Sequence, residues 1–284
     1  MKRTHQASLL LATIACLPLI SCGTYIPSQR DWPNSSTSDV IRMNATLAHS
    51  VVCELSYAVT LAIRNDLDLA SRSPGGKAYS EFLQDWGVEV ATDLTVSENS
   101  TIAPGFIWTP DKPISIGGGV SVGSVSTNET QYNVFFPLSA LYKPNLFRLD
   151  DKTRPCRNPD SNNEGSPLID IDLKILPTLE SRLITVRLGI AGAPTPENTI
   201  VGEKNVLSQT VSIKESISGD VTPKWVFTTK SVNPDGTFFK AGRDRTHQLV
   251  FTFGPMTPGT RSLNPLAEAF HLTQLERAGL RNDR

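Results

Sequence analysis

The sequence has no excess of basic residues, and this absence limits the partners that the protein can have. Its 284 residues include 27 Lys and Arg against 28 Asp and Glu, a formal net charge of −1. A nucleic-acid partner is therefore not expected, because such partners are held by a basic surface. Hydrophobic residues make up 39% of the chain and charged residues 19%, which is typical of a globular chain and excludes an intrinsically disordered one.

Two short motifs of cofactor sites are present only in part. Gly75-Gly76-Lys77 lacks the earlier glycine and the following Ser or Thr of a phosphate-binding loop. A partial calcium-loop spacing occurs at Asp160, Asn162, Glu164 and Gly165. The position of that loop that needs a glutamate is occupied by Ile171. The sequence therefore predicts no cofactor and no metal site.

The apolar run at the N-terminus is too short to span a bilayer. It covers residues 7–20, whereas a membrane-spanning helix needs about 20 apolar residues. Lys2 and Arg3 precede the run, and a basic start followed by a short apolar run is typical of an export signal peptide. We expect residues 1–21 to be this signal peptide.

The apolar run ends in Leu19-Ile20-Ser21-Cys22, which resembles the lipobox of bacterial lipoproteins. This resemblance implies cleavage before Cys22, acylation of the Cys22 thiol and attachment to a lipid membrane through that residue. Two or more acyl chains anchor a protein stably, whereas one chain binds only marginally. Gly23 stands where an aspartate would resemble an inner-membrane retention mark. The expected location is therefore the outer membrane, on its periplasmic face.

A lipidated, flexible tether is expected to follow the signal peptide. Residues 22–38 are rich in Ser, Pro and Asn, and when fully extended they would reach roughly 50 Å from the acyl chains. Removal of residues 1–21 takes Lys2 and Arg3 from the 27 basic residues and leaves 25 against 28 acidic ones. The mature chain therefore has a net charge near −3, which again disfavours nucleic acid.

Cysteine is scarce, with four residues in the whole chain. Cys16 leaves with the signal peptide and Cys22 carries lipid, so only Cys53 and Cys156 remain. Export to an oxidising compartment favours a disulfide between these two, and two buried free thiols are the alternative. On a helix, Cys53 would lie beside the apolar stripe on a polar flank, where a loop cysteine could meet it.

The first expected region of the mature chain, residues 39–141, combines a helix with β-rich sequence. The helix is expected over about residues 38–64, because apolar residues recur there at spacings of three and four. These residues are Leu47, Val51, Leu55, Ala58 and Ala62. From Trp86 the period changes to two, which is typical of antiparallel strands with one buried face. We expect Asn99 and Asn128 near turns between these strands.

The second expected region, residues 168–284, follows an irregular linker or large loop over residues 142–167 and can form one domain with the first region. Strands are expected around residues 184–190, 211–213, 225–227 and 249–253, while residues 168–183 fit a helix or a strand. Asn264-Pro265 predicts the start of an amphipathic helix with Leu266, Phe270 and Leu275 facing inward. The predicted fold class is mainly antiparallel β, sandwich-like, with an N-terminal and a short C-terminal helix.

Three segments of the mature chain resemble a group of uncharacterised proteobacterial lipoproteins. They are Val52-Cys53-Glu54-Leu55, residues 86–108, and residues 223–255 with their closing Thr252-Phe253-Gly254-Pro255. The resemblance covers much of the mature chain and implies no activity.

The sequence contains one match to a catalytic serine motif, at residues 119–123. Gly119-Val120-Ser121-Val122-Gly123 matches the G-x-S-x-G nucleophile elbow, in which the serine occupies a tight turn from a strand into a helix. Here the motif lies within a period-two strand, so small residues on a strand face are the structural alternative. In a hydrolase, Ser121 would be the nucleophile and His247 the base. On the expected strand, His247 lies on the same face as Leu249 and Phe251, because side chains alternate between the two faces. This position predicts either a histidine at the edge of the core or a ligand contact.

Three functions follow from these observations. The favoured one is a non-catalytic envelope lipoprotein, a binding or structural module with an envelope protein or a glycan as its partner. The second is a serine hydrolase that uses Ser121 and His247. The third is a subunit of an oligomeric membrane β assembly, which the Gly and Ser residues opposite Ile114, Ile116, Val120 and Val122 suggest.

Overall fold

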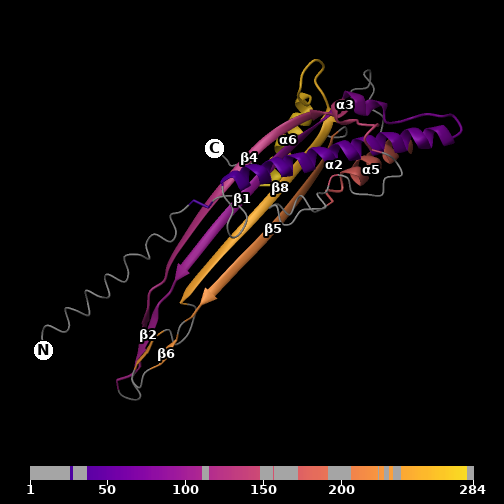
Figure 1. Cartoon of the computed structure of the whole chain (residues 1–284). Coiled ribbons are helices and arrows are strands. Elements are labelled where there is room, and N and C mark those ends of the chain that lie inside the picture. The colour runs from indigo at the N-terminus through magenta and orange to yellow at the C-terminus, as the bar shows by residue number, and fades with distance from the viewer. Residues whose placement is uncertain are drawn as a thin grey trace. The chain divides into compact units, whose positions relative to one another are not determined.

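The structure is a computed structural model that describes residues 26–27, 37–110, 115–147, 156, 172–190, 206–222, 224–226, 230–232 and 238–279. Helices and strands follow one another along the chain as shown in Figure 1. They are α2 (Thr37–Arg72), η2 (Glu81–Asp85), β1 (Trp86–Ile102), β2 (Gly105–Trp108), β3 (Ile116–Gly119), β4 (Val122–Pro137), α3 (Leu138–Leu141), α5 (Ile175–Arg187), β5 (Leu207–Val221), β6 (Trp225–Val226), β7 (Lys230–Val232), β8 (Phe239–Pro255) and α6 (Pro265–Arg277).

The strands form two interrupted hairpins with the same plan. In the first, β1 continues into β2, and β3 continues into β4; in the second, β5 continues into β6, and β7 into β8. The long strands form an antiparallel sheet in the order β4-β1-β8-β5, and the short ones form a sheet in the matching order β3-β2-β7-β6. Backbone hydrogen bonds from Ala103 N to Phe238 O and from Val120 N to Pro104 O bridge the interruptions.

The chain divides into two compact units, and the long strands contribute residues to both. Unit 1 comprises Met1–Gln29, Leu94–Thr130 and Lys214–Thr246, and unit 2 comprises Arg30–Asp93, Gln131–Ile213 and His247–Arg284. The long sheet takes β1 and β4 from one side of residues 142–167 and β5 and β8 from the other side.

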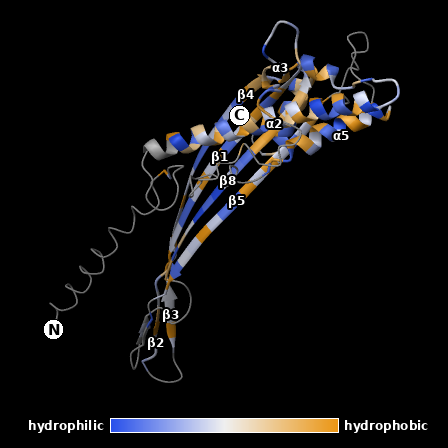
Figure 2. Ribbon diagram, turned by 45° about the vertical axis from the view of Figure 1, so that its right-hand side comes forward, coloured by the Kyte–Doolittle hydropathy of each residue, from blue (hydrophilic) through white to orange (hydrophobic). Residues whose placement is uncertain are grey.

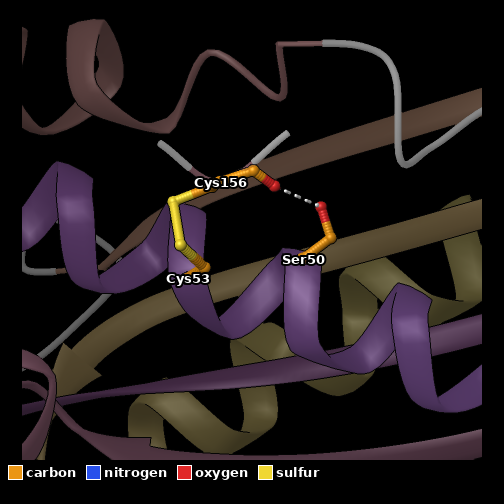
Figure 3. The surroundings of a disulfide bond; sticks show 3 residues. All are labelled: Ser50, Cys53 and Cys156. Carbon is orange, nitrogen blue, oxygen red and sulfur yellow. Dashed lines mark hydrogen bonds between the residues drawn. A yellow bond between two sulfur atoms is a disulfide. The ribbon is translucent and has the colours of Figure 1, made fainter. Parts of the chain in front are cut away.

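Unit 2 is built of helices on both faces of a sheet. α2 lies on one face, and α6 lies on the other (Figures 1 and 3). The core under α2 contains fully buried side chains of β1 and β8: Trp86, Val88, Leu249, Phe251 and Phe253. The predicted stripe of α2 is also buried, with Leu47, Leu55 and Ala62 at 0% exposure, because a half-apolar helix gains stability by covering an apolar sheet face.

One stretch of α2, Ile41–Arg72, is long and apolar enough by length and composition to cross a membrane. More than half of its most apolar window, 56%, is buried inside the fold. α5 and α3 pack against it. Arg64 donates hydrogen bonds to the carbonyls of Pro144 (3.0 Å) and Phe147 (2.8 Å). We therefore describe α2 as a core helix of unit 2, as its apolar stripe predicts.

The predicted fold class is confirmed: the protein is mainly antiparallel β with an N-terminal helix and a C-terminal helix. Asn264 caps α6 as predicted, since its Oδ1 accepts a hydrogen bond from Ala267 N at 2.8 Å. Of the residues expected to face inward, Leu275 packs against the buried side chains of Ala91 and Val250, whereas Leu266 is 43% exposed. Ala267 and His271 are the buried residues of this helix. Gly254 leaves the room that Ala267 fills, because a Cβ at Gly254 would lie 2.8 Å from the Ala267 Cβ.

Two other local predictions are wrong. The strand expected over residues 184–190 is the end of helix α5, whose buried residues Ile175, Leu179, Leu183 and Val186 follow helical spacing. Pro177 lies in the first turn of this helix, where the missing N–H costs nothing. Asn99 and Asn128 are strand residues of β1 and β4 and not turn residues. Most of the expected linker over residues 142–167 lies outside the described residues.

Candidate functional site

The predicted disulfide residues lie in unit 2. Cys53 of α2 and Cys156 are joined by a disulfide, with their Cα atoms 5.3 Å apart (Figure 3). Ser50, one turn earlier on the helix, donates a hydrogen bond from its Oγ to the carbonyl of Cys156 at 3.2 Å. The flank of α2 therefore holds one residue of a distant segment by a covalent bond and a hydrogen bond.

The predicted lipidation residue and the residues of the partial calcium-loop spacing lie outside the described residues. They are Cys22 and the set Asp160, Asn162, Glu164 and Gly165. Among the residues that the structure describes, no group of three or more His, Cys, Asp or Glu side chains is placed to hold a metal ion.

The residues proposed for a hydrolase do not have the local geometry of one. Ser121 is exposed and lies in the two-residue connection between β3 and β4. β4 begins at the next residue, so the strand-to-helix turn that raises the serine of a nucleophile elbow is not formed. His247 is fully buried in β8, as its parity predicts.

The most unusual surface is the part of the long sheet that lies in unit 1. Of the described residues of unit 1, only Pro27, Leu94 and Val96 are buried. An antiparallel sheet usually buries one face against a core. Here, both faces of four neighbouring strand segments are accessible over most of their length, and Figure 2 shows hydrophilic and hydrophobic residues alternating along them. The sheet of unit 1 therefore has almost no core of its own.

Side-chain contacts define the two faces of this part of the sheet. On the first, which we call the Leu94 face, Arg243 pairs with Glu98 at 3.2 Å and Arg245 with Glu215 at 2.5 Å. On the second, the Ser97 face, Thr127 donates to the Ser97 hydroxyl at 3.1 Å. Since side chains alternate along a strand, these contacts assign all neighbouring residues to a face.

The two faces differ in composition. The Ser97 face consists of Thr95, Ser97, Asn99, Thr101, Gly123, Val125, Thr127, Glu129, Lys214, Ser216, Ser218, Asp220, Lys240, Gly242, Asp244 and Thr246, of which Val125 alone is a large apolar residue. The Leu94 face combines the two ion pairs with eight apolar side chains and six small or polar residues. The apolar residues are Leu94, Val96, Ile102, Val122, Ile217, Val221, Phe239 and Ala241, and the others are Ser100, Ser124, Ser126, Asn128, Thr130 and Gly219.

The short sheet of unit 1 carries an exposed apolar patch. Phe106, Trp108 and Ile116 are 53%, 43% and 49% exposed. In the antiparallel register, Phe106 is opposite Gly118, and Trp108 is opposite Ile116. Phe106 packs over the Gly118 backbone, since a Cβ there would lie 2.9 Å from the ring. Gly118, which lies on the same face as Ile116 and opposite to Gly117 and Gly119, thus leaves room for an aromatic side chain.

The two outer strands of the long sheet have a neighbour on one side only, within the part of the chain that the structure describes. β4 and β5 are 16 and 15 residues long. An open edge of that length presents a row of backbone N–H and C=O groups that can pair with another strand. β4 and β5 run in opposite directions, so a β5 strand added beside β4 would continue the antiparallel alternation.

Unit 2 contains a buried polar network between the sheet and α6. His271 Nδ1 lies 2.8 Å from Thr252 Oγ1, and Asn133 donates to Glu89 Oε1 at 2.5 Å. Burial, with a further contribution from neighbouring Glu268, raises the pKa of Glu89 to about 7. Burial lowers the pKa of His271, against the opposing charge of Glu268. The network fastens α6 to the sheet.

A second polar cluster fastens the loop after α2. The Asp66 side chain is 2% exposed and accepts hydrogen bonds from Tyr79 N at 2.6 Å, Ser80 N at 2.9 Å and Arg187 at 2.6 Å. The Arg187 guanidinium also lies over the Tyr79 ring, 5.9 Å from its centroid. These contacts were not evident from the sequence, because the partners of Asp66 lie 13 to 121 residues away.

No family model matches the chain, and no curated protein matches it. Among solved structures, the secretin InvG of the Salmonella SPI-1 type III secretion injectisome is similar in its open gate state, with 8% identity, a TM-score of 0.21, and 69% of this chain and 66% of that chain covered. The same secretin in a near-atomic cryo-EM structure matches with 9% identity, a TM-score of 0.15, and 69% and 70% covered. The chain thus spans slightly less than two thirds of the first of these. TM-scores this low do not establish a shared fold.

Proposed function

We propose that the protein is a non-catalytic, lipid-anchored structural subunit of the bacterial outer membrane that assembles with copies of itself into a continuous β wall. The observation that carries the proposal is the sheet of unit 1, which, among the residues that the structure describes, has two open edges, two accessible faces and almost no core. Pairing of β5 of one copy with β4 of the next would close these edges.

Edge pairing explains why so bare a sheet can be stable. An exposed, long edge strand is a site of uncontrolled association, and proteins usually shorten, cover or charge such edges. Closure of strands into a ring removes every edge and satisfies the backbone hydrogen bonds. The unit 1 part of β1, residues 94–102, extends roughly 30 Å, so each copy would contribute four strands of about this length to the wall.

The N-terminal sequence supports the location of this assembly. The lipobox-like segment that ends at Cys22 and the following Gly23 favour an acyl anchor in the outer membrane. The net charge near −3 and the missing nucleophile elbow leave a structural role better supported than a nucleic-acid or hydrolytic one. Another envelope protein or a glycan as the partner of the open edges is the competing outcome of the test below.

The proposal is tested with the full-length lipoprotein extracted from outer membranes in mild detergent. A photo-crosslinking benzoylphenylalanine is placed at Thr127 in edge strand β4 or at Ser216 in edge strand β5, and at Ser97 in the inner strand β1 as a matched control. We expect the edge probes to give crosslinked dimers of this chain, mapped by mass spectrometry from β4 to β5, and the control to give far fewer. Light scattering should give a multiple of the protomer mass.

Two results would overturn the proposal. One is a monomeric mass with no crosslink between copies, and the other is an edge probe that captures a different protein or a glycan in place of a second copy. The anchor is tested separately: labelled palmitate should be incorporated into the wild type, and the Cys22→Ser variant should lose this label.

A further inference from the structure

We infer that the Leu94 face of the assembled wall faces membrane lipid and that the Ser97 face lines a water-filled lumen, so that the assembly is a conduit for hydrophilic solutes. This inference rests on the proposed function and goes beyond it, because a β wall could equally be a solid support. Three independent observations in unit 1 carry it.

The first observation is the chemistry of the two faces. Fifteen of the sixteen residues listed for the Ser97 face are polar, charged or glycine, and five of these sixteen are charged. Such a surface is unfavourable against hydrocarbon, because unpaired charged side chains, lysine and arginine above all, are costly near the bilayer centre. The same surface is well suited to water. A lipid-facing wall built on the Ser97 face is therefore excluded.

The second observation is that charged side chains on the Leu94 face are paired with one another. Glu98, Arg243, Glu215 and Arg245 form two ion pairs on this face. Beyond these pairs, toward the strand ends that lead into the short sheet, the face consists largely of apolar and small residues: Ile102, Val122, Ser124, Ile217, Gly219, Val221, Phe239 and Ala241. Ile217, Val221 and Val122 are 54%, 59% and 62% exposed, so they are free to contact lipid.

The uncharged arms of the first hairpin are long enough for a membrane crossing. Residues 99–110 and 115–128 contain no charged residue, and each arm combines parts of a long and a short strand. In the second hairpin, Asp220 and Lys240 are charged and lie on the Ser97 face. A transmembrane strand needs about 9–11 residues. Exposed Phe106 and Trp108 lie within these uncharged arms, and aromatic residues of this kind are typical of a membrane interface.

The third observation ties the anchor to the Leu94 face. Asn128 has the parity of Val122 and Ser124, and its side-chain amide donates to the carbonyl of Pro27 at 2.9 Å. Pro27 is buried and follows Cys22 by five residues. Five peptide units span at most about 18 Å, so an acylated Cys22 enters the bilayer close to this point. The membrane and the Leu94 face are thus on the same side of the sheet.

The test uses adjacent positions on opposite faces of one strand. Ile217→Cys lies on the Leu94 face and Ser218→Cys on the Ser97 face, both on exposed residues of β5. Ser126→Cys and Thr127→Cys form a second pair on β4. Each full-length variant is reconstituted in vesicles of phosphatidylethanolamine and phosphatidylglycerol and in planar bilayers of the same composition. The two probes are a cationic, water-soluble methanethiosulfonate and a thiol fluorophore that nitroxide-labelled lipid quenches.

We expect the methanethiosulfonate to react at least tenfold faster with Ser218→Cys and Thr127→Cys than with their neighbours, and to reduce the ionic conductance when it does. The fluorophore on Ile217→Cys should be quenched by nitroxide lipid, and that on Ser218→Cys should not. Lipid quenching on the Ser97 face, or equal reaction rates on both faces of an intact oligomer, would overturn the inference and leave the proposed function standing. A monomer would overturn both.

Discussion

On the Leu94 face, Arg245 Nη2 of β8 lies 2.5 Å from Glu215 Oε2 of the edge strand β5, and Arg245 Nε also donates to the same oxygen at 3.0 Å. The Glu215 side chain is 42% exposed within one copy, so solvent screens this pair and its contribution to protomer stability is small, below about 1 kcal/mol. Against lipid, however, either charge without its partner would be costly.

From this we predict that Arg245→Ala changes the stability of the protomer little but reduces assembly in the membrane. Urea unfolding of the unlipidated Cys22→Ser protein should shift by less than about 1 kcal/mol. Oligomer yield from outer membranes should fall several-fold, and Glu215→Ala in the same chain should recover part of it. Equal oligomer yields for Arg245→Ala and wild type would contradict a lipid-facing Leu94 face.

Asp66 is predicted to be one of the largest single contributors to the stability of unit 2. Asp66→Ala leaves Arg187 and the backbone N–H groups of Tyr79 and Ser80 without their shared acceptor. Breaking a buried charged pair from one side costs about 3–5 kcal/mol. Equilibrium unfolding in urea should show this loss. The matched control is Asp68→Ala, which removes the exposed partner of Arg72 and should cost less than about 0.5 kcal/mol.

The disulfide is predicted to stabilise the protein mainly by restricting the unfolded chain. It joins residues 103 apart, which corresponds to about 4–5 kcal/mol in the chain-entropy model. A Cys53→Ser/Cys156→Ser variant should unfold at lower urea concentration than wild type, and a reducing agent should lower the midpoint of wild type but not that of the variant. An unchanged wild-type midpoint under reduction would show that the two thiols are not paired in the protein.

The close approach of α6 to β8 predicts that a second substitution, on α6, restores the stability lost by a substitution on β8. Gly254→Ala would place a Cβ 2.8 Å from that of Ala267, so α6 must move or the core must strain. Overpacking of this kind costs about 1–3 kcal/mol. Ala267→Gly restores the space, so the double variant should be more stable than Gly254→Ala alone despite the helix-weakening glycine. Additive losses in the double variant, measured by urea unfolding, would contradict the packing described here.

The sequence predicted the elements whose pattern is local. The stripe of α2, the change to period two at Trp86 and the Asn264 cap are all present. The strand prediction for residues 184–190 was wrong, because Ile184, Val186, Leu188 and Ile190 alternate as in a strand. The helical spacing from Ile175 to Val186 competes with that alternation, and contacts to α2, such as Asn65 with Glu180, favour the helix.

The candidate site was harder to predict, because it is defined by strand order. The polar alternation around Ser97 and Thr127 is visible in the sequence, but the pairing of β1 with both β4 and β8, which gathers these residues on one face, depends on contacts up to about 150 residues apart. The open edges of β4 and β5 follow from the same pairing. The cluster around Asp66 was hidden for the same reason.

The network under α6 predicts that unit 2 loses stability as the pH rises. Burial raises the pKa of Glu89 from 4.5 to about 7, so the folded protein favours the protonated carboxyl more than the unfolded chain does. The stability that Glu89 contributes is complete below pH 4.5 and is lost as the pH rises through about 7. The loss is about 1–3 kcal/mol. His271 acts in the opposite sense, since its lowered pKa removes stability only as the pH falls below 6.5.

The Glu89→Gln variant separates these two effects. It keeps an oxygen that can accept from Asn133 and cannot ionise. Between pH 6.5 and pH 8, above the range in which His271 acts, its unfolding free energy should therefore stay nearly constant, whereas that of wild type should fall. The exposed Glu81→Gln variant serves as the control and should follow the wild-type profile. If Glu89→Gln loses the same stability as wild type between these pH values, the carboxyl at Glu89 does not govern the docking of α6.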